Sequence, residues 1–326
     1  MRSWQVITYG PPEIALKLEE LPDPEPDDDE VLVRVHCAGV NFPDLLLCEG
    51  SYHHKPVLPF GLGMEASGLV VAVGTKVDSV GIGSRVLMAP MSYGCFSELC
   101  IGPEWAVFPL DGNVSWEKGA ALFMSYHTAW VGLHRRAHLR TGEWVVVAGA
   151  SGGVGSAAVD VARSAGANTI GIVSSRKKAD FIRERGCDYA IVLGEDSVVG
   201  FVREVTSGRG ADVVFDPVGG PVFREALRCL GVEGRYLVVG FASGDIPTIG
   251  VNYLLMKNVD VVGFRLQPFR EDRGYAKAVH SKVMELVNHG GVSPAISEEY
   301  GFMDVPAAVA RLRKRDVMGK IIVNVA

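Results

Sequence analysis

Residues 143–155, EWVVVAGASGGVG, constrain the fold more than any other part of the sequence. An apolar run typical of a buried strand leads into a glycine-rich turn, and the turn opens a segment with apolar residues at helical spacing. Five more strand-like runs follow, most of them separated by helical segments: Asn168–Val173, Ala190–Leu193, Asp212–Phe215, Arg235–Val239 and Val259–Phe264. This alternation predicts an α/β fold with a doubly wound, mostly parallel sheet covered by helices on both faces.

The glycine turn also predicts where an anionic ligand binds. Gly152 lets the backbone approach a pyrophosphate, Gly155 lets helix and strand pack closely, and the helix N-terminus offers free N–H groups. The first glycine of the usual G-x-G-x-x-G pattern is an alanine here, so the flanking strand and helix make the motif specific. A turn without ligand is the alternative. The predicted dinucleotide contacts are Ala150, Ser151, Gly152, Gly153, Val154 and Gly155.

The end of the second strand determines the choice between NADH and NADPH. An acidic residue at this place would bind the ribose 2′-hydroxyl of NADH. The sequence here is SSRKK over residues 174–178, and the first carboxylate is Asp180. Cations and hydroxyls suit a 2′-phosphate, so Ser174, Arg176 and Lys178 are predicted to bind NADPH. The alternative is a basic, solvated first turn of a helix.

The flanking stretches have other patterns. Val31, Val33 and Val35 alternate with Leu32, Arg34 and His36, the period of a half-buried strand. Residues 66–88 hold apolar runs broken by glycines, as in a small barrel or sandwich. After residue 265, helices are expected near Tyr275–Val287 and Val305–Leu312 and a strand over Lys320–Val325. One short final strand cannot form a domain, so we expect it to rejoin the first stretch.

Composition excludes several classes of protein. With 48% hydrophobic and 21% charged residues, the 326-residue chain is globular and long enough for roughly two domains. A net charge of −6 provides no field that attracts nucleic acid or an anionic membrane. No membrane-spanning run and no signal peptide are visible. Six cysteines without a CxxC pair do not resemble a disulfide framework, so a reduced, cytoplasmic protein is expected.

Several motifs resemble the medium-chain dehydrogenase/reductase superfamily, and within it the zinc-independent quinone oxidoreductases related to zeta-crystallin. In the family's order they are AGVNFPD (38–44), GSY (50–52), KPVLP (55–59), GMEASG (63–68), ASGGVG (150–155) and DPVGG (216–220). The resemblance covers essentially the whole chain. It implies a GroES-like, β-rich catalytic domain of residues 1–119 and 265–326, with a Rossmann NADPH-binding domain of residues 120–264 inserted.

The resemblance also bears on metal binding. Zinc-dependent relatives carry a cysteine and a histidine where this chain has Asn41 and Met64, and amide and thioether are poor Zn²⁺ ligands. His134 and His138 have an i,i+4 spacing, but two arginines lie between them, and we expect them on a helix surface. No bound zinc is expected, and without a metal reversible alcohol oxidation is disfavoured.

With alcohol oxidation disfavoured, the reaction expected is hydride transfer from NADPH to an electron-poor acceptor. By resemblance, Asn41 and Tyr52 line the pocket near the nicotinamide, and Tyr52 is the candidate to hydrogen-bond the acceptor oxygen and donate a proton. The alternative for Tyr52 is a packing residue. Relatives often place a tyrosine near the 2′-phosphate where this chain has Leu193, which weakens the NADPH prediction. Further cofactor contacts implied by resemblance are Asn41, Thr128, Phe241, Ser243, Phe264 and Lys320.

The leading hypothesis is an NADPH-dependent quinone oxidoreductase, and two alternatives stay open. A reductase of an enone, 2-alkenal or enoyl thioester would have the same fold. A cofactor-binding crystallin-like or RNA-associated protein would use the basic patch at residues 311–315. The resemblance also implies a homodimer through Val259–Phe264, because a bare apolar edge strand promotes aggregation.

Overall fold

The computed structural model describes all 326 residues, which form two compact units. One unit consists of residues 1–124 and 294–326, and the other of residues 125–293. The sequence analysis places the boundaries after residues 119 and 264, whereas the structure places them after residues 124 and 293. The second boundary shows the larger difference. Residues 265–293 join the second unit because helix α11 (Arg273–Asn288) packs Ala276 and Val279 beside His127 and Val131 of that unit.

The first unit is built on two sheets. The seven-stranded sheet has the order β15-β16-β3-β5-β6-β8, with β7 also paired to β3, and the three-stranded sheet has the order β2-β1-β4. The strands of the first unit are β1 (Arg2–Val6), β2 (Leu16–Glu20), β3 (Glu30–Val40), β4 (Phe60–Gly61), β5 (Ala66–Val73), β6 (Arg85–Met88), β7 (Leu99–Pro103), β8 (Val107–Pro109), β15 (Ile296–Gly301) and β16 (Lys320–Asn324).

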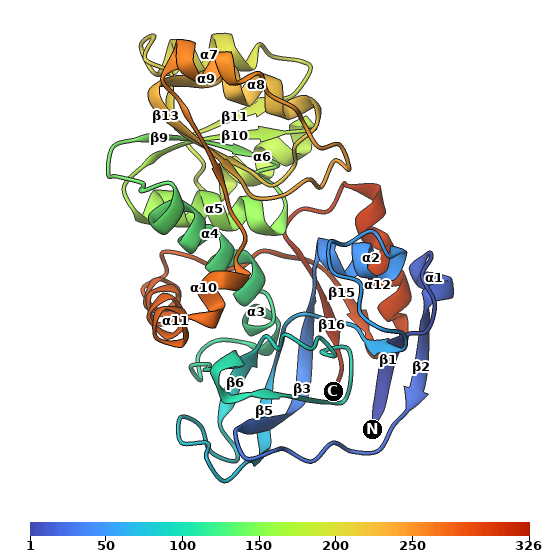
Figure 1. Cartoon of the computed structure of the whole chain (residues 1–326). Helices are drawn as coiled ribbons and strands as arrows, with labels where there is room; N and C mark the ends of the chain where they lie inside the picture. The colour runs from blue at the N-terminus through green and yellow to red at the C-terminus, as the bar shows by residue number, and fades with distance from the viewer. The chain divides into compact units, whose positions relative to one another are not determined.

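Short helices cover the ends of these sheets (Figure 1). They are α1 (Pro12–Ala15), α2 (Phe42–Glu49), α3 (Trp116–Gly119) and α12 (Val305–Arg311), with short 3₁₀ turns at Glu104–Ala106, Phe302–Asp304 and Leu312–Lys314. Strand β16 pairs antiparallel with β3, in a register that places Ile321 opposite Val40. The expectation that the last strand rejoins the first stretch is therefore confirmed.

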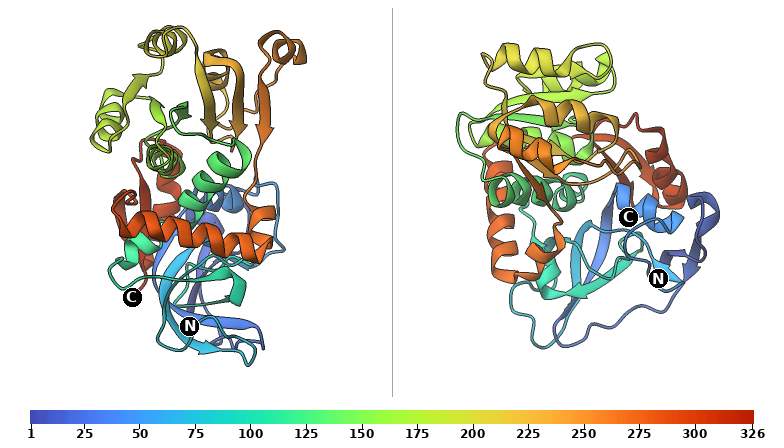
Figure 2. Two further views of the ribbon diagram at one scale, coloured as in Figure 1. Left: turned by 90° about the vertical axis from the view of Figure 1, so that its left-hand side faces the viewer. Right: turned by 45° about the horizontal axis from the view of Figure 1, so that its top comes forward.

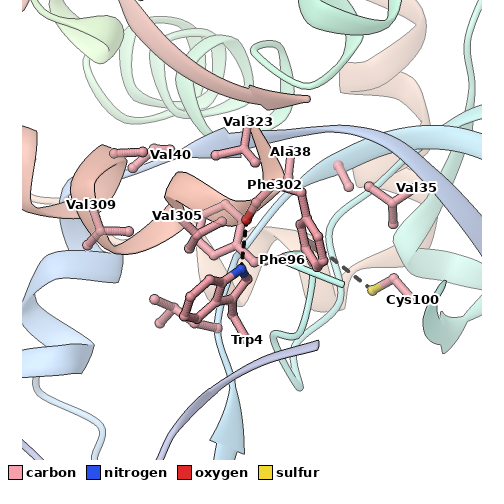
Figure 3. Close-up of a cluster of buried hydrophobic side chains, with 14 of the residues drawn as sticks. Trp4, Val35, Ala38, Val40, Phe96, Cys100, Phe302, Val305, Val309 and Val323 are labelled. Atoms are coloured by element: carbon pink, nitrogen blue, oxygen red, sulfur yellow. Dashed lines mark hydrogen bonds between the residues drawn. The ribbon is translucent and has the colours of Figure 1, made fainter. Parts of the chain in front are cut away.

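The core of the first unit joins both ends of the chain (Figure 3). The indole N–H of Trp4 donates to the carbonyl oxygen of Phe302 at 2.8 Å. Around this contact pack Phe96 from the middle of the chain and Val305 and Val309 from α12. Because the contact joins residues 298 positions apart, this core cannot close before the last segment of the chain is in place.

The second unit is a six-stranded parallel sheet with the order β11-β10-β9-β12-β13-β14. Figure 1 shows α7, α8 and α9 on one face of this sheet and α4 and α5 on the other. The strands are β9 (Trp144–Ala148), β10 (Asn168–Val173), β11 (Tyr189–Val192), β12 (Ala211–Asp216), β13 (Leu230–Val238) and β14 (Asp260–Gly263). All six predicted strands are present, and the predicted doubly wound sheet is confirmed.

The helices of this unit vary in length, and α11 is the longest of them (Figure 2). Besides α11 they are α4 (Thr128–Trp130), α5 (Gly153–Ser164), α6 (Arg176–Glu184), α7 (Val198–Val205), α8 (Pro221–Cys229), α9 (Val251–Lys257) and α10 (Gln267–Glu271). Two π-helical turns, Phe123–His127 and Val131–Arg136, flank α4. None of the chain's helices combines the length and the apolar character that crossing a membrane requires.

A buried carboxylate holds the turn after β12. Asp216 Oδ1 accepts hydrogen bonds from the backbone N–H groups of Val218 at 2.8 Å and Gly219 at 3.0 Å. The hydroxyl of Tyr236, on the neighbouring strand β13, donates to Asp216 Oδ2 at 2.6 Å. Burial raises the pKa of Asp216, and these hydrogen bonds oppose that shift. The DPVGG motif is therefore a structural turn at the carboxyl edge of the sheet.

Replacing Tyr236 by phenylalanine should destabilise the second unit. The change removes the shorter of the two hydrogen bonds to Oδ2 of a buried carboxyl and leaves only the 3.2 Å bond from the Gly219 N–H. Hydrogen bonds to such groups contribute about 1–3 kcal/mol. We expect the free energy of unfolding, measured by urea denaturation, to fall by this amount. Tyr253→Phe is the control, because its buried hydroxyl has no hydrogen-bond partner and its loss should not destabilise. Equal losses in both variants would contradict the role given to the Asp216 contact.

Candidate active site

The turn between β9 and α5 leaves the first N–H groups of the helix without a side-chain partner. Gly152 is the N-cap and supplies no capping oxygen, and the first turn of α5 holds no acidic residue. A Cβ atom on Gly155 would overlap the carbonyl oxygen of Gly149, so the close packing of helix on turn requires glycine there. Free N–H groups at a helix N-terminus attract anions. The turn therefore fits the pyrophosphate of a dinucleotide.

The residues predicted to contact the pyrophosphate lie together in this turn, and the structure explains the alanine in the motif. Gly149 takes the left-handed conformation, with φ of 60°. Ala150 does not, so it tolerates a side chain. Its methyl group packs beside Gly171 of β10, where an added Cβ would come within 2.8 Å of it. Ser151 is buried, and residues 152–155 offer backbone rather than side-chain groups.

The three residues predicted to bind the 2′-phosphate also lie together, at the carboxyl end of β10. Ser175 caps α6 by accepting a hydrogen bond from the Lys178 N–H, and Lys178 Nζ donates to Ser174 Oγ at 3.1 Å. Arg176 extends into solvent and pairs with Glu195. The first turn of α6 carries no acidic residue, so its helix N-terminus and its cations favour an anion together.

The segments after β13 and β14 carry the next predicted contacts. Ser243 N–H donates to the carbonyl of Val218 at 2.9 Å, so the loop that holds Phe241 and Ser243 lies over the DPVGG turn. The Phe264 N–H donates to the carbonyl of Val238 at 3.0 Å, which places Phe264 at the end of β14. Because the strands are parallel, all of these groups lie at one edge of the sheet.

Thr128 begins α4 and is buried. The preceding π-helical turn is anchored by Tyr126, whose hydroxyl donates to Asp160 Oδ2 of α5 at 2.7 Å. π-Helical turns are rare and often mark functional sites. In the same turn, His127 Nε2 lies 3.4 Å from His280 Nδ1, and burial lowers the pKa of His127 well below its usual value. Burial therefore favours the neutral form of His127.

In the first unit, the candidate residues Asn41 and Lys320 meet in a buried polar network. Lys320 Nζ donates to Glu65 Oε1 at 2.7 Å, to Asn41 Oδ1 at 2.7 Å and to the carbonyl of Val40 at 3.0 Å. Asn41 Nδ2 donates to the same Glu65 oxygen at 3.0 Å. The other oxygen of Glu65 accepts from the Met124 N–H at 2.9 Å. Lys320 and Glu65 are almost fully buried.

This network uses every hydrogen that the two candidate side chains can donate. The ammonium of Lys320 has three hydrogens and three acceptors. The amide of Asn41 has two hydrogens, which meet Glu65 and the Gly39 carbonyl at 3.2 Å. A cofactor contact by Lys320, as predicted, would require one of these bonds to break. Asn41 keeps only its carbonyl oxygen for a further hydrogen bond, as an acceptor.

The donor set around Asn41 does not fit zinc. Its amide oxygen contacts an ammonium group, which would repel a divalent cation, and Met64 offers only a thioether. No three His, Cys, Asp or Glu side chains lie close enough together to hold a metal ion. The expectation that His134 and His138 lie together on a helix surface is wrong, because the helix ends at residue 136 and His138 has a φ of 48°.

Two acidic residues of this network, Glu65 and Asp44, were not among the residues predicted from the sequence. Asp44 Oδ2 accepts from the Asn41 N–H at 2.8 Å and caps α2, and burial raises the pKa of Asp44 to about 7. Both residues lie inside the quoted motifs AGVNFPD and GMEASG. A carboxylate within a largely apolar motif is the sequence feature that could have identified each of them as a buried polar residue.

Tyr52 lies in the bend after α2. Its N–H donates to the Leu46 carbonyl at 3.2 Å, and its ring lies 4.1 Å from that of His53. The side chain is half-buried against the core of the first unit. The position is compatible with both readings of Tyr52, the proton donor and the packing residue.

Comparison with known proteins adds independent information. A model of the alcohol dehydrogenase GroES-like domain matches residues 27–113, and a model of zinc-binding dehydrogenases matches residues 153–288. The chain is 38% identical over 298 residues to quinone oxidoreductase-like protein 2 homolog of Nematostella vectensis, covering 90% of this chain and 81% of that protein. These matches confirm the resemblance that the motifs predict.

Solved structures agree. A quinone oxidoreductase of Pseudomonas syringae pv. tomato DC3000 has a TM-score of 0.92 and 30% identity, with 99% of each chain covered. Escherichia coli quinone oxidoreductase, crystallised with NADPH, has a TM-score of 0.93 and 27% identity, with 100% of each chain covered. The predicted pairing of a GroES-like domain with a Rossmann domain is thus confirmed.

Replacing Lys320 by methionine should destabilise the first unit strongly. The change leaves the Glu65 carboxylate buried without its cation, and removing one partner of a buried pair costs about 3–5 kcal/mol. We expect a loss of this size in the free energy of unfolding, measured by urea denaturation. Lys282→Met is the matched control, since it breaks an exposed pair with Glu285 and should change stability little. Similar stability of the two variants would exclude a structural role for the buried pair.

Proposed function

Because this chain belongs to the quinone oxidoreductase family of medium-chain dehydrogenases/reductases, we propose that it is an NADPH-dependent quinone oxidoreductase that works without zinc. The observation that carries the proposal is the carboxyl edge of the parallel sheet. There an uncapped helix N-terminus follows a glycine turn, and a cluster of cations and hydroxyls lies at the end of the next strand. Relatives named quinone oxidoreductase support the reaction class.

Each part of the cofactor has residues that suit it. The N–H groups of residues 152–155 would hold the pyrophosphate, and Ser174, Arg176 and Lys178 would hold the 2′-phosphate. Thr128 and Phe264 are proposed to position the nicotinamide end. NADPH supplies the hydride when it is bound. A protein of this kind mainly has to align donor and acceptor and exclude water.

In the first unit, Asn41 and Tyr52 are proposed to serve the acceptor. The network with Lys320 and Glu65 fixes the Asn41 amide, so that its carbonyl oxygen faces a defined direction. Tyr52 carries the phenol that would hydrogen-bond the acceptor oxygen and deliver a proton to it. A phenol suffices here, since a quinone is already electron-poor and needs no Lewis acid to accept a hydride.

The structure weakens the RNA-binding alternative. The patch at residues 311–315 looks basic in sequence, but two of its four cations, Arg311 and Arg313, form ion pairs within the chain. Arg311 contacts Glu298 and Asp316, and Arg313 contacts Glu49. These pairs reduce the positive charge that the patch offers to phosphates.

The proposal is tested by NADPH oxidation, followed at the absorbance of the reduced nicotinamide, with an ortho-quinone as acceptor and NADH in parallel. Quinone-dependent oxidation of NADPH, faster than that of NADH, supports it. If quinones are not reduced but a 2-alkenal, enone or enoyl thioester is, the double-bond reductase replaces it. Absence of turnover with all acceptors, despite tight NADPH binding, favours a binding role.

Replacing Tyr52 by phenylalanine should lower kcat with the quinone by about 10²-fold, because general acid catalysis contributes at least this much. KM should change less, since the ring remains. Steady-state kinetics measures both. Tyr9→Phe is the control, because the Tyr9 hydroxyl donates to the Pro56 carbonyl in the same unit and has no proposed part in the reaction. An unchanged kcat in Tyr52→Phe would identify Tyr52 as a packing residue.

We also propose a cytoplasmic homodimer that pairs through Val259–Phe264. Six free, buried cysteines support a reducing compartment. Strand β14 is the last strand of its sheet and pairs only with β13. Beside it, α9 exposes Val251, Leu255 and Met256 to solvent. An open strand edge next to exposed apolar side chains is well suited to a second copy of the chain.

Val261→Lys should convert such a dimer into monomers, since it introduces a charge into the paired edge. Sedimentation velocity would then give half the mass, with the circular dichroism spectrum unchanged. Met303→Lys is the control, because Met303 is an exposed apolar residue of the other unit. If the sedimentation profile of Val261→Lys matches that of the unmodified protein, the interface lies elsewhere.

A further inference from the structure

The cation predicted to recognise the 2′-phosphate is already paired inside the chain. Arg176 Nε donates to Glu195 Oε2 at 2.9 Å, and the two side chains are 84% and 48% exposed. Glu195 was not among the residues predicted from the sequence, because it follows Arg176 by 19 positions. The sequence around the end of β10 shows cations and hydroxyls alone, whereas the structure adds the carboxylate of Glu195.

Strand register explains why the two residues meet. Strands β10 and β11 are parallel neighbours, and Val173 lies opposite Val192. Arg176 and Glu195 each follow these paired residues by three positions. The turn after β11 is held by its backbone, since Glu195 N–H donates to the Val192 carbonyl at 3.1 Å. The carboxylate is therefore presented to the first turn of α6 by the sheet itself.

A second carboxylate strengthens the effect. Asp196 follows directly, and its Oδ2 accepts from the Val192 N–H at 3.3 Å. The charges of Glu195 and Asp196 both raise the pKa of Arg176, with the Glu195 hydrogen bond as the largest cause. Two acidic side chains thus lie near the three cations at the start of α6, and they reduce the net positive charge of the predicted phosphate site without removing it.

We propose that Glu195 competes with the 2′-phosphate of NADPH for Arg176 and thereby sets the preference of this chain between NADPH and NADH. The inference rests on the proposed NADPH site. A 2′-phosphate must displace the carboxylate from Arg176 and meets its negative charge. The 2′-hydroxyl of NADH meets instead a hydrogen-bond acceptor, the group that favours NADH in dinucleotide sites. The Glu195 side chain is therefore expected to weaken the binding of NADPH and to strengthen the binding of NADH.

Because Arg176 and Glu195 are both exposed, their ion pair can open when a 2′-phosphate binds. An exposed ion pair contributes little to stability, so Arg176 can change partners. Lys178 and Ser174 are joined by their own hydrogen bond and take no part in the Arg176–Glu195 pair. The chain is thus expected to prefer NADPH only moderately.

The test compares Glu195→Gln with the unmodified full-length protein. Dissociation constants for NADPH and NADH are measured by isothermal titration calorimetry, together with those for adenosine 2′,5′-bisphosphate and adenosine 5′-monophosphate, which probe the adenosine end alone. We expect NADPH and the bisphosphate to bind about 3–10-fold more tightly to Glu195→Gln, from the typical strength of an exposed charge pair. NADH and the monophosphate should bind equally or more weakly.

Glu204→Gln is the control, because it changes the net charge equally from an exposed position on α7 of the same unit. It should leave all four constants unchanged. An unchanged ratio of NADPH to NADH affinity in Glu195→Gln would overturn the inference. So would an equal gain in a background that already carries Arg176→Gln, since Glu195 would then act without Arg176. If the unmodified protein binds neither dinucleotide, the proposed function itself fails.

Discussion

The ammonium of Lys320 and the carboxylate of Glu65 form the contact on which the first unit depends. A charge buried this deeply is stable only when it is paired and hydrogen-bonded. Lys320 meets this requirement at the start of the last strand, with acceptors at the end of β3, at Asn41 and at Glu65. The contact therefore ties the C-terminal segment to the first hundred residues and fixes the orientation of a candidate catalytic side chain.

The chain matches a zinc-binding dehydrogenase model but has poor zinc ligands. The same contact explains what replaces the metal environment in this chain. At the position where zinc-dependent relatives carry a cysteine, an amide oxygen here accepts a hydrogen bond from an ammonium. An ammonium is a fixed charge without an open coordination position, so it cannot polarise an alcohol as a metal does. Reduction of an acceptor that is already electron-poor suits such a site.

In the second unit, a parallel sheet gathers the ends of several strands at one edge. That edge brings together the glycine turn, the basic start of α6 and the acidic turn after β11. Affinity for a cofactor then depends on the sum of charges from separate loops. Arg176 and Glu195 illustrate this, because the sequence around either residue alone predicts a different cofactor preference.

The sequence by itself determined the strands, the glycine turn and the family, because hydrophobic periodicity and glycine placement act within about ten residues. It did not determine which unit holds residues 265–293, since an amphipathic helix can pack on any apolar surface. Nor did it show the pairs of Lys320 with Glu65 and Arg176 with Glu195. Those pairs were decided by the tertiary structure, because strand order and register alone bring charges from distant segments within hydrogen-bond distance.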